Sequence, residues 1–163
     1  MRIAALMLIA ALGLAAAGCG GDEQAAAPPK PPAPKRSAYA EALNGLCAKR
    51  LASLEAIGNP TSPDELKRLM PKQLVVLKRF SADSKALRAK AAEAKAKKDF
   101  DRFYATYVDG QIYALKTLKG GSFDGYFRVA DSALAWQRQA EKTAVKLGAR
   151  TCSKRPFEDQ APS

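Results

Sequence analysis

Apolar residues return every three or four positions between residues 38 and 57, among them Leu43, Cys47, Leu51 and Leu54. This spacing places them on one face of an α-helix. The pattern stops at Gly58-Asn59-Pro60, a sequence that favours a turn. The first predicted element is therefore an amphipathic helix that ends just before this turn.

A second helix is predicted to begin directly after it. Ser62 can cap the helix, Pro63 suits the first helical position, and Glu65 completes the pattern of a capping box. Apolar positions then continue as far as Leu87. Pro71 lies within them, and because proline lacks a backbone N–H it is expected to kink or split the helix after Met70.

Two further helices complete the pattern. Residues 85–98 are rich in good helix formers, so only Asp99, a possible N-cap, suggests where the third helix begins. Gly110 is a weak point within it, and Gly120-Gly121 end it. Ser122 is expected to cap a fourth helix that runs to Gly148. The expected buried stripes are Phe100, Phe103, Tyr104, Tyr107, Val108, Ile112, Leu115 and Leu118 in the third helix, and Phe127, Ala130, Leu134, Ala140, Val145 and Leu147 in the fourth.

No window of the chain alternates between apolar and polar residues with the period of a strand. The sequence therefore predicts an all-α fold: a four-helix bundle over residues 37–152, with short connections and most simply up-down-up-down topology. About 116 residues suit one domain with one core. Residues 153–163 are expected to form a disordered C-terminal tail.

The first eighteen residues have the pattern of an export signal. Arg2 supplies a positive charge, and residues 3–17 carry no charge at all. This apolar run is shorter than the roughly 20 residues that a membrane-spanning helix needs. It ends in Leu14-Ala15-Ala16-Ala17-Gly18-Cys19, which resembles the lipobox of bacterial lipoproteins. The resemblance implies cleavage before Cys19 and acylation of its thiol, although Ala16 stands where Leu is commoner. Cleavage at an ordinary A-x-A-like site is the alternative.

Residues 19–36 follow as a tether rich in alanine and proline, with no large apolar side chain. Such a segment cannot bury enough surface to offset its ordering entropy, so we expect it to be disordered. It would hold the folded domain at the extracytoplasmic face of the cell membrane, with the acyl chains on Cys19 as the anchor. A proline ligand for an SH3-like module is the alternative interpretation.

Two cysteines remain for the folded domain, Cys47 in the first helix and Cys152 just past the last. In an oxidising compartment two such thiols usually pair. An antiparallel bundle brings the end of its last helix near the start of its first, so a structural disulfide is sterically reasonable. A redox-active or metal-binding thiol is the alternative, but the chain has no C-x-x-C motif.

A first helix with one cysteine, a GGSFDGYF turn before a long helix, and the ending LGARTC together resemble a group of small, uncharacterised helical lipoproteins of high-GC bacteria. The resemblance covers most of residues 37–152. It implies the bundle and the Cys47–Cys152 bond, and it implies no activity.

The composition argues against an enzyme. The chain has no histidine, which removes the commonest general base and metal ligand. Only Met70 of the three methionines follows the predicted signal. The carboxylates form no EF-hand pattern, and the glycines form no phosphate-binding loop. We therefore predict a protein that is not an enzyme and that needs no metal or other cofactor.

The formal net charge is +11, and part of it is concentrated near the junction of the second and third helices. The predicted export argues against nucleic acid as a partner, which leaves anionic wall polymers, lipid headgroups or an envelope protein. A merely solvated helix face is the simpler interpretation. The candidate binding residues are Lys85, Arg88, Lys90, Lys95, Lys97 and Lys98.

A different class of function is a small-molecule carrier with an aromatic pocket inside the bundle. Trp136 and the tyrosines Tyr104, Tyr107, Tyr113 and Tyr126 could line such a pocket. At helical spacing, however, large aromatic side chains more often belong to the core. We therefore predict a lipid-anchored, non-enzymatic binding or structural module, with the carrier as the alternative.

Overall fold

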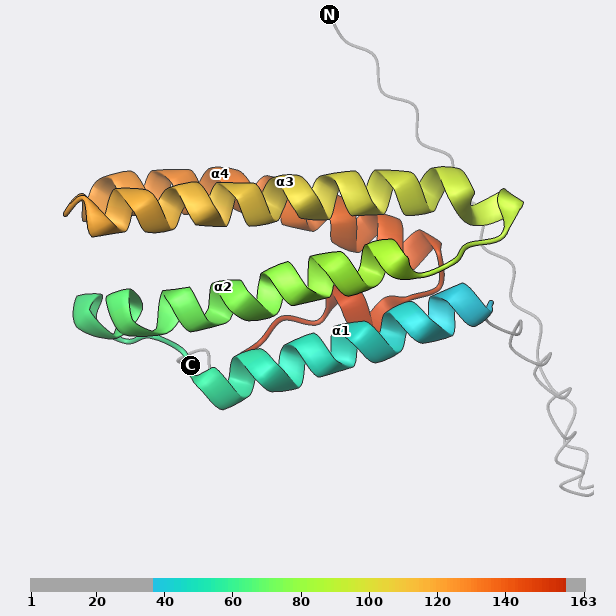
Figure 1. Cartoon of the computed structure of the whole chain (residues 1–163), viewed down its shortest axis with the longest axis horizontal. Coiled ribbons are helices and arrows are strands. Elements are labelled where there is room, and N and C mark those ends of the chain that lie inside the picture. Colours follow the sequence, from blue (N-terminus) through green and yellow to red (C-terminus); the bar gives the residue numbers. More distant parts are fainter. Residues whose placement is uncertain (1–36, 158–163) are drawn as a thin grey trace, which may run out of the picture. The chain divides into compact units, whose positions relative to one another are not determined.

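The computed structural model describes residues 37–157, and these form an all-α domain (Figure 1). Its elements are α1 (Ala38–Ile57), α2 (Pro63–Ala86), η1 (Ala91–Glu93), α3 (Ala94–Lys119), α4 (Phe123–Lys146) and η2 (Arg150–Ser153). The prediction of four helices without strands is confirmed over these residues. None of the four helices is long and apolar enough to cross a membrane. The predicted signal, Cys19, the tether and residues 158–163 lie outside the described residues.

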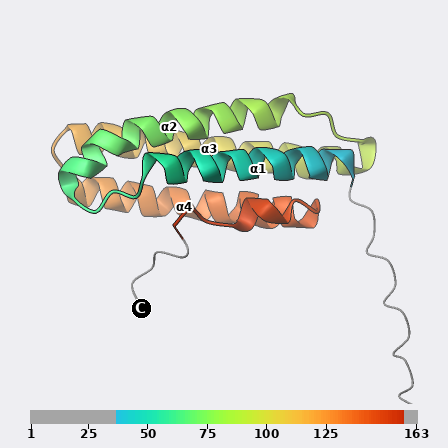
Figure 2. The same ribbon diagram turned by 90° about the horizontal axis from the view of Figure 1, so that it is seen from below.

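The four helices lie lengthwise, and the chain turns back at each connection in Figure 1. The closest packing is between α3 and α4, while α2 packs on α3 and α1 packs on α2. The short helix η2 contacts both α4 and α1, so the segment after the last long helix returns to the first one (Figure 2). The bundle is therefore closed between α4 and α1 chiefly by η2.

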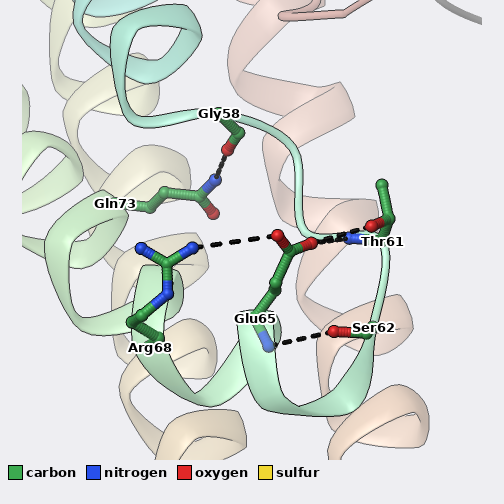
Figure 3. A network of polar contacts seen from close by, with 6 residues as sticks. All are labelled: Gly58, Thr61, Ser62, Glu65, Arg68 and Gln73. Atoms are coloured by element: carbon green, nitrogen blue, oxygen red, sulfur yellow. Dashed lines mark hydrogen bonds and ion pairs between the residues drawn. The ribbon is translucent and has the colours of Figure 1, made fainter.

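The start of α2 is capped largely as predicted (Figure 3). The Ser62 hydroxyl accepts a hydrogen bond from the Glu65 N–H at 3.2 Å, and Pro63 occupies the first turn. The Glu65 carboxylate, however, accepts from the backbone N–H of Thr61 at 2.8 Å and from its hydroxyl at 2.7 Å. A true capping box would return this carboxylate to the N-cap residue itself. Here it reaches one residue further back, and Gln73 donates to the Gly58 carbonyl oxygen at 2.8 Å to fix the preceding turn.

Pro71 does not split the second helix. Helix α2 is continuous from Pro63 to Ala86 with Pro71 inside it. The buried side chains Met70 and Leu74 on either side of the proline both belong to the core cluster. Burial of this apolar stripe offsets the roughly 3 kcal/mol that a proline costs inside a helix.

The third helix begins earlier than predicted. It starts at Ala94, and η1 precedes it, so Asp99 lies inside α3 and is not its N-cap. The chain makes its turn at Lys90, whose backbone N–H donates to the Glu93 carboxylate at 3.3 Å. Asp99 instead pairs with Arg102 on the helix surface at 3.3 Å. The alanines of residues 91–96 suit a helix, which explains why no strong stop was visible before Asp99.

Helices α3 and α4 approach each other through small residues. A Cβ atom added to Gly110 would lie 2.6 Å from the Ala133 Cβ. The buried face of α4 is accordingly mostly alanine, at Ala133, Ala140 and Ala144. Three larger residues that were expected to be buried are instead exposed: Phe127, Leu134 and Val145. The predicted stripe of α4 was therefore wrong at these three positions, whereas Ala140 is buried and Ala130 and Leu147 pack against the core as predicted.

A cluster of aromatic rings forms the centre of the core. The Phe80 ring lies 4.6 Å from the ring of Tyr104 and 6.3 Å from that of Phe100. Tyr107 follows one turn later on α3, 5.5 Å from Tyr104. Aromatic pairs at these separations stabilise a core beyond the area that they bury. The aromatic stripe predicted for the third helix is thus the part of the sequence pattern that the core uses most.

Cys47 and Cys152 form a disulfide, as predicted. Both are almost fully buried. Asn44, one turn before Cys47, donates to the Gly148 carbonyl oxygen at 3.3 Å and accepts from the Thr151 N–H at 2.9 Å. These contacts hold the segment just before Cys152 against α1. The disulfide therefore joins residues that are 105 positions apart in the sequence.

Candidate functional site

The predicted basic residues are gathered at one end of the domain. Lys85 is in the last turn of α2, Arg88 and Lys90 are in the connection, and Lys95 and Lys98 are in the first turns of α3. All five side chains are exposed. No carboxylate of residues 37–157 forms an ion pair with any of the five. We call these five residues the basic end.

Lys97 does not belong to the basic end. Its ammonium group is half-buried, bonds to the Asp101 carboxylate and donates to the Lys85 carbonyl oxygen at 3.1 Å. This lysine joins the end of α2 to the start of α3. It is therefore a structural contact, and the prediction that it binds a partner does not fit its position.

Acidic side chains near the basic end are mostly engaged by their own neighbours. Asp101 is paired with Lys97, Asp99 with Arg102, and Glu93 accepts the Lys90 N–H. Within residues 37–157, none of these three carboxylates forms an ion pair with a residue of the basic end. Ion pairs and hydrogen bonds of this kind also position the turn from which the basic residues project.

The first residue that the structure describes lies at the same end. In both views the beginning of α1 and the connection between α2 and α3 are side by side (Figures 1 and 2). Tyr39, in the first turn of α1, is close enough to Asp101 and Glu93 that their charges contribute to its raised pKa, after the larger effect of burial. The last turn of α4 also ends here and adds the exposed Lys146. Sequence reasoning missed Lys146 because only the fold brings it near the others.

The predicted aromatic residues divide between core and surface. Tyr104, Tyr107 and Tyr126 are buried. Burial raises the pKa of all three. Tyr113 and Trp136 are exposed by 61% and 43%. Trp136 stacks on Phe103 at 5.9 Å on the outside of the α3–α4 pair, so neither of these two residues lines an internal pocket.

A cleft lies between α1 and α2 on one side and α4 on the other. It consists of two adjoining cavities of about 320 and 220 Å³, which share Leu54, Leu77, Tyr107 and Leu134. Pro156 lies at the rim of both cavities. Part of the predicted disordered tail, residues 153–157, is thus placed against the bundle, where the Lys154 carbonyl oxygen accepts from Arg50 at 3.4 Å.

Arg50 and Glu141 are the charged residues of the cleft that the sequence analysis missed. Both are buried, at 4% and 9% exposure. Arg50 follows Cys47 by three positions and precedes Leu54 by four, so it is a charge on the apolar face of α1. A charged residue at an apolar position of the helical pattern could have been recognised from the sequence. Glu141 lies beside Ala140 and accepts a hydrogen bond from Gln137 at 2.7 Å.

Neither the basic end nor the cleft has the ligands of a metal centre. Among residues 37–157 no group of three or more cysteine, aspartate or glutamate side chains gathers where it could hold a metal ion. The predicted absence of enzymatic activity stays a prediction. No protein-family model, curated protein or solved structure matches this chain.

Proposed function

We propose that this chain is a lipid-anchored, non-enzymatic protein of the bacterial cell envelope whose basic end binds an anionic envelope surface. The lipobox-like segment before Cys19 supports the anchor. One structural observation carries the binding proposal: the five cations of the basic end, which form no ion pair within residues 37–157, lie at the end where the described chain begins. A tether that enters there would present these cations to the surface in which it is anchored.

The electrostatics favour a membrane surface over a distant polymer. Each Lys or Arg near an anionic leaflet contributes about 1 kcal/mol, and the attraction decays within a Debye length of about 8 Å at physiological salt. Five exposed cations on one end can act together only if that end meets the surface. Phosphate-bearing wall polymers offer the same chemistry, and they are distinguished by experiment.

The anchor is tested by replacing Cys19 with Ser in the full chain. The unchanged protein should fractionate with membranes and carry acyl chains in its mass spectrum, whereas the Cys19→Ser variant should carry none and leave the membrane fraction. Recovery of an unmodified chain cut at another position would show ordinary secretion instead.

Binding is tested on a chain that begins at residue 37, so that the anchor does not contribute. Its co-sedimentation with vesicles containing anionic lipid, and with purified cell wall, is measured over a salt series. We expect the Lys90→Gln, Lys95→Gln, Lys98→Gln variant to bind up to about a hundredfold more weakly to anionic vesicles. Stronger retention on cell wall than on vesicles would assign the basic end to wall polymers.

A matched control separates position from net charge. Lys116, Lys119 and Arg128 are exposed, and they lie in the last turn of α3 and the first turns of α4, at the opposite end of the domain. Replacing these three with Gln removes the same charge. If this control lost as much binding as the first variant, the basic end would have no special role.

A further inference from the structure

The charged side chains of the cleft described above all line one of its two cavities. These are Arg50, Arg138, Glu141 and Arg155, beside Gln137. The other cavity has no charged lining residue: Met70, Tyr126, Ala130 and Phe157 line it together with the shared leucines and two glutamines, Gln73 and Gln111. The larger cavity has the volume of a small-molecule site. A ligand that filled the cleft would therefore be polar at one end and apolar along the rest.

Arg50 is a buried charge without an anionic partner among residues 37–157. No carboxylate of residues 37–157 forms an ion pair with it, and its Nε has no hydrogen-bond partner. Its guanidinium lies 5.2 Å from the Phe80 ring centroid and 5.9 Å from that of Tyr104. Removing an ion from water costs several kcal/mol unless an opposite charge and hydrogen bonds replace the water. Arg50 donates to the carbonyl oxygen of Lys154, but this single neutral acceptor replaces little of the lost hydration.

The balance of charges in the cleft is positive. Arg50, Arg138 and Arg155 all lie near enough to Glu141 to lower the pKa of its carboxyl. Burial nevertheless outweighs them and raises that pKa above its ordinary value. Glu141 thus offsets at most one of three guanidinium groups. Guanidinium groups bind carboxylate and phosphate oxygens in pairs of parallel hydrogen bonds, so the cleft suits an anion of that kind.

We propose that the cleft binds a small amphiphile with one carboxylate or phosphate head and a single apolar chain. The head lies between Arg50, Arg138 and Arg155, where it accepts a hydrogen bond from the Arg50 Nε–H. The chain runs past Tyr107 and Leu134 into the uncharged cavity, toward Met70 and Ala130. This site uses no residue of the basic end, so the experiments on the cleft and on the basic end test separate proposals.

The test is calorimetric titration of the chain from residue 37 onward, which contains the described core and the cleft. The probes share one ten-carbon chain and differ in the head: decanoate, decyl phosphate, decanol and decyltrimethylammonium, each below its micelle concentration. We expect the two anions to bind, with the preferred anion identifying the head group. Decanol should bind at least tenfold more weakly, and the cation should not bind measurably.

Variants on exposed positions avoid disturbing the core. Arg138→Gln combined with Arg155→Gln should weaken decanoate binding tenfold or more. The control is Arg128→Gln combined with Lys142→Gln, which removes equal charge from exposed positions of α4 that do not line the cleft. Equal binding of decanol and decanoate, or equal loss in the control, would overturn the proposal.

The chain itself supplies one competing anion, since Glu158 and Asp159 follow Phe157 directly. The variant Glu158→Gln, Asp159→Asn is therefore titrated in parallel. Decanoate binding that changes less than threefold supports an external ligand. Binding that appears only in this variant would assign the cleft to the acidic residues of the chain, and the proposal would be wrong.

Discussion

The close contact between α3 and α4 predicts that Gly110→Ala destabilises the domain. In most helix interiors the change from glycine to alanine stabilises by about 1 kcal/mol. Here the new Cβ would lie 2.6 Å from the Ala133 Cβ and 3.4 Å from its Cα. Carbon atoms in contact are normally about 3.5–4.0 Å apart, so the two helices must separate by about 1 Å.

The expected size follows from two opposing effects. Overpacking of this kind costs about 1–3 kcal/mol, and the gain in helix propensity offsets about 1 kcal/mol of it. We therefore expect Gly110→Ala to lower the free energy of unfolding by about 1 kcal/mol. Gly45 is the matched control, because it lies exposed in α1 and an added Cβ there meets nothing within 4 Å. Gly45→Ala should stabilise the domain by about 1 kcal/mol.

The assay is urea unfolding followed by far-ultraviolet circular dichroism. The two variants should differ by about 2 kcal/mol, or roughly 8 °C in the thermal midpoint for a domain of this size. Adding Ala133→Gly to the Gly110→Ala variant should recover most of the packing cost, which a double-mutant cycle measures directly. If Gly110→Ala proved as stable as Gly45→Ala, the close approach of the two helices would not exist in solution.

Three further predictions concern the disulfide and two carboxyl groups. Replacing Cys47 and Cys152 with Ala should lower the free energy of unfolding by about 2–5 kcal/mol, and an unchanged urea midpoint would show that the bond does not constrain the unfolded chain. Burial raises the pKa of Glu141, so ionising this carboxyl lowers the stability of the folded state as pH rises above the unfolded carboxyl value of about 4.3. Glu141→Gln should therefore stabilise the domain near neutral pH but not in acid. Equal effects of the substitution at both pH values would contradict this. The Thr61 N–H and hydroxyl lower the pKa of Glu65, so the stability that these hydrogen bonds contribute is present above the unfolded pKa and is lost as pH falls through the folded pKa. A titration by nuclear magnetic resonance should place the pKa of Glu65 below its ordinary value. Thr61→Ala should return this pKa part of the way to that value.

The sequence predicted the helices better than it predicted their buried faces. The bounds of α1 and the start of α2 follow from a regular stripe and from local capping groups, which act within a few residues. The start of α3 was misplaced because its first turns carry no large apolar residue. The face of α4 was only partly predicted: Ala133 was missed because it faces Gly110, and a pattern within one helix contains no information about the size of the facing residue.

The candidate sites were likewise predictable only in part. The basic end could be predicted because most of its residues are close together in the sequence. The cleft could not, because Arg50 and Glu141 are far apart in the chain and become neighbours only through packing. Lys97 shows the opposite error, since a lysine in a charged run was read as solvent-exposed and proved to be bonded to Asp101. The position of a charge along the chain is known from the sequence, but only the fold determines whether an opposite charge pairs with it.

The disulfide also determines how the domain carries mechanical load. Tension that enters at residue 37 and leaves beyond residue 152 runs along α1 only as far as Cys47 and then crosses the covalent bond. The helices α2, α3 and α4 lie inside the loop that this bond closes, so they bear none of it. Pulling can extend residues 37–47 to about 35 Å before the bond stops further unravelling. Such extension would remove Tyr39 and Leu43 from the core, while α2, α3 and α4 would carry no load.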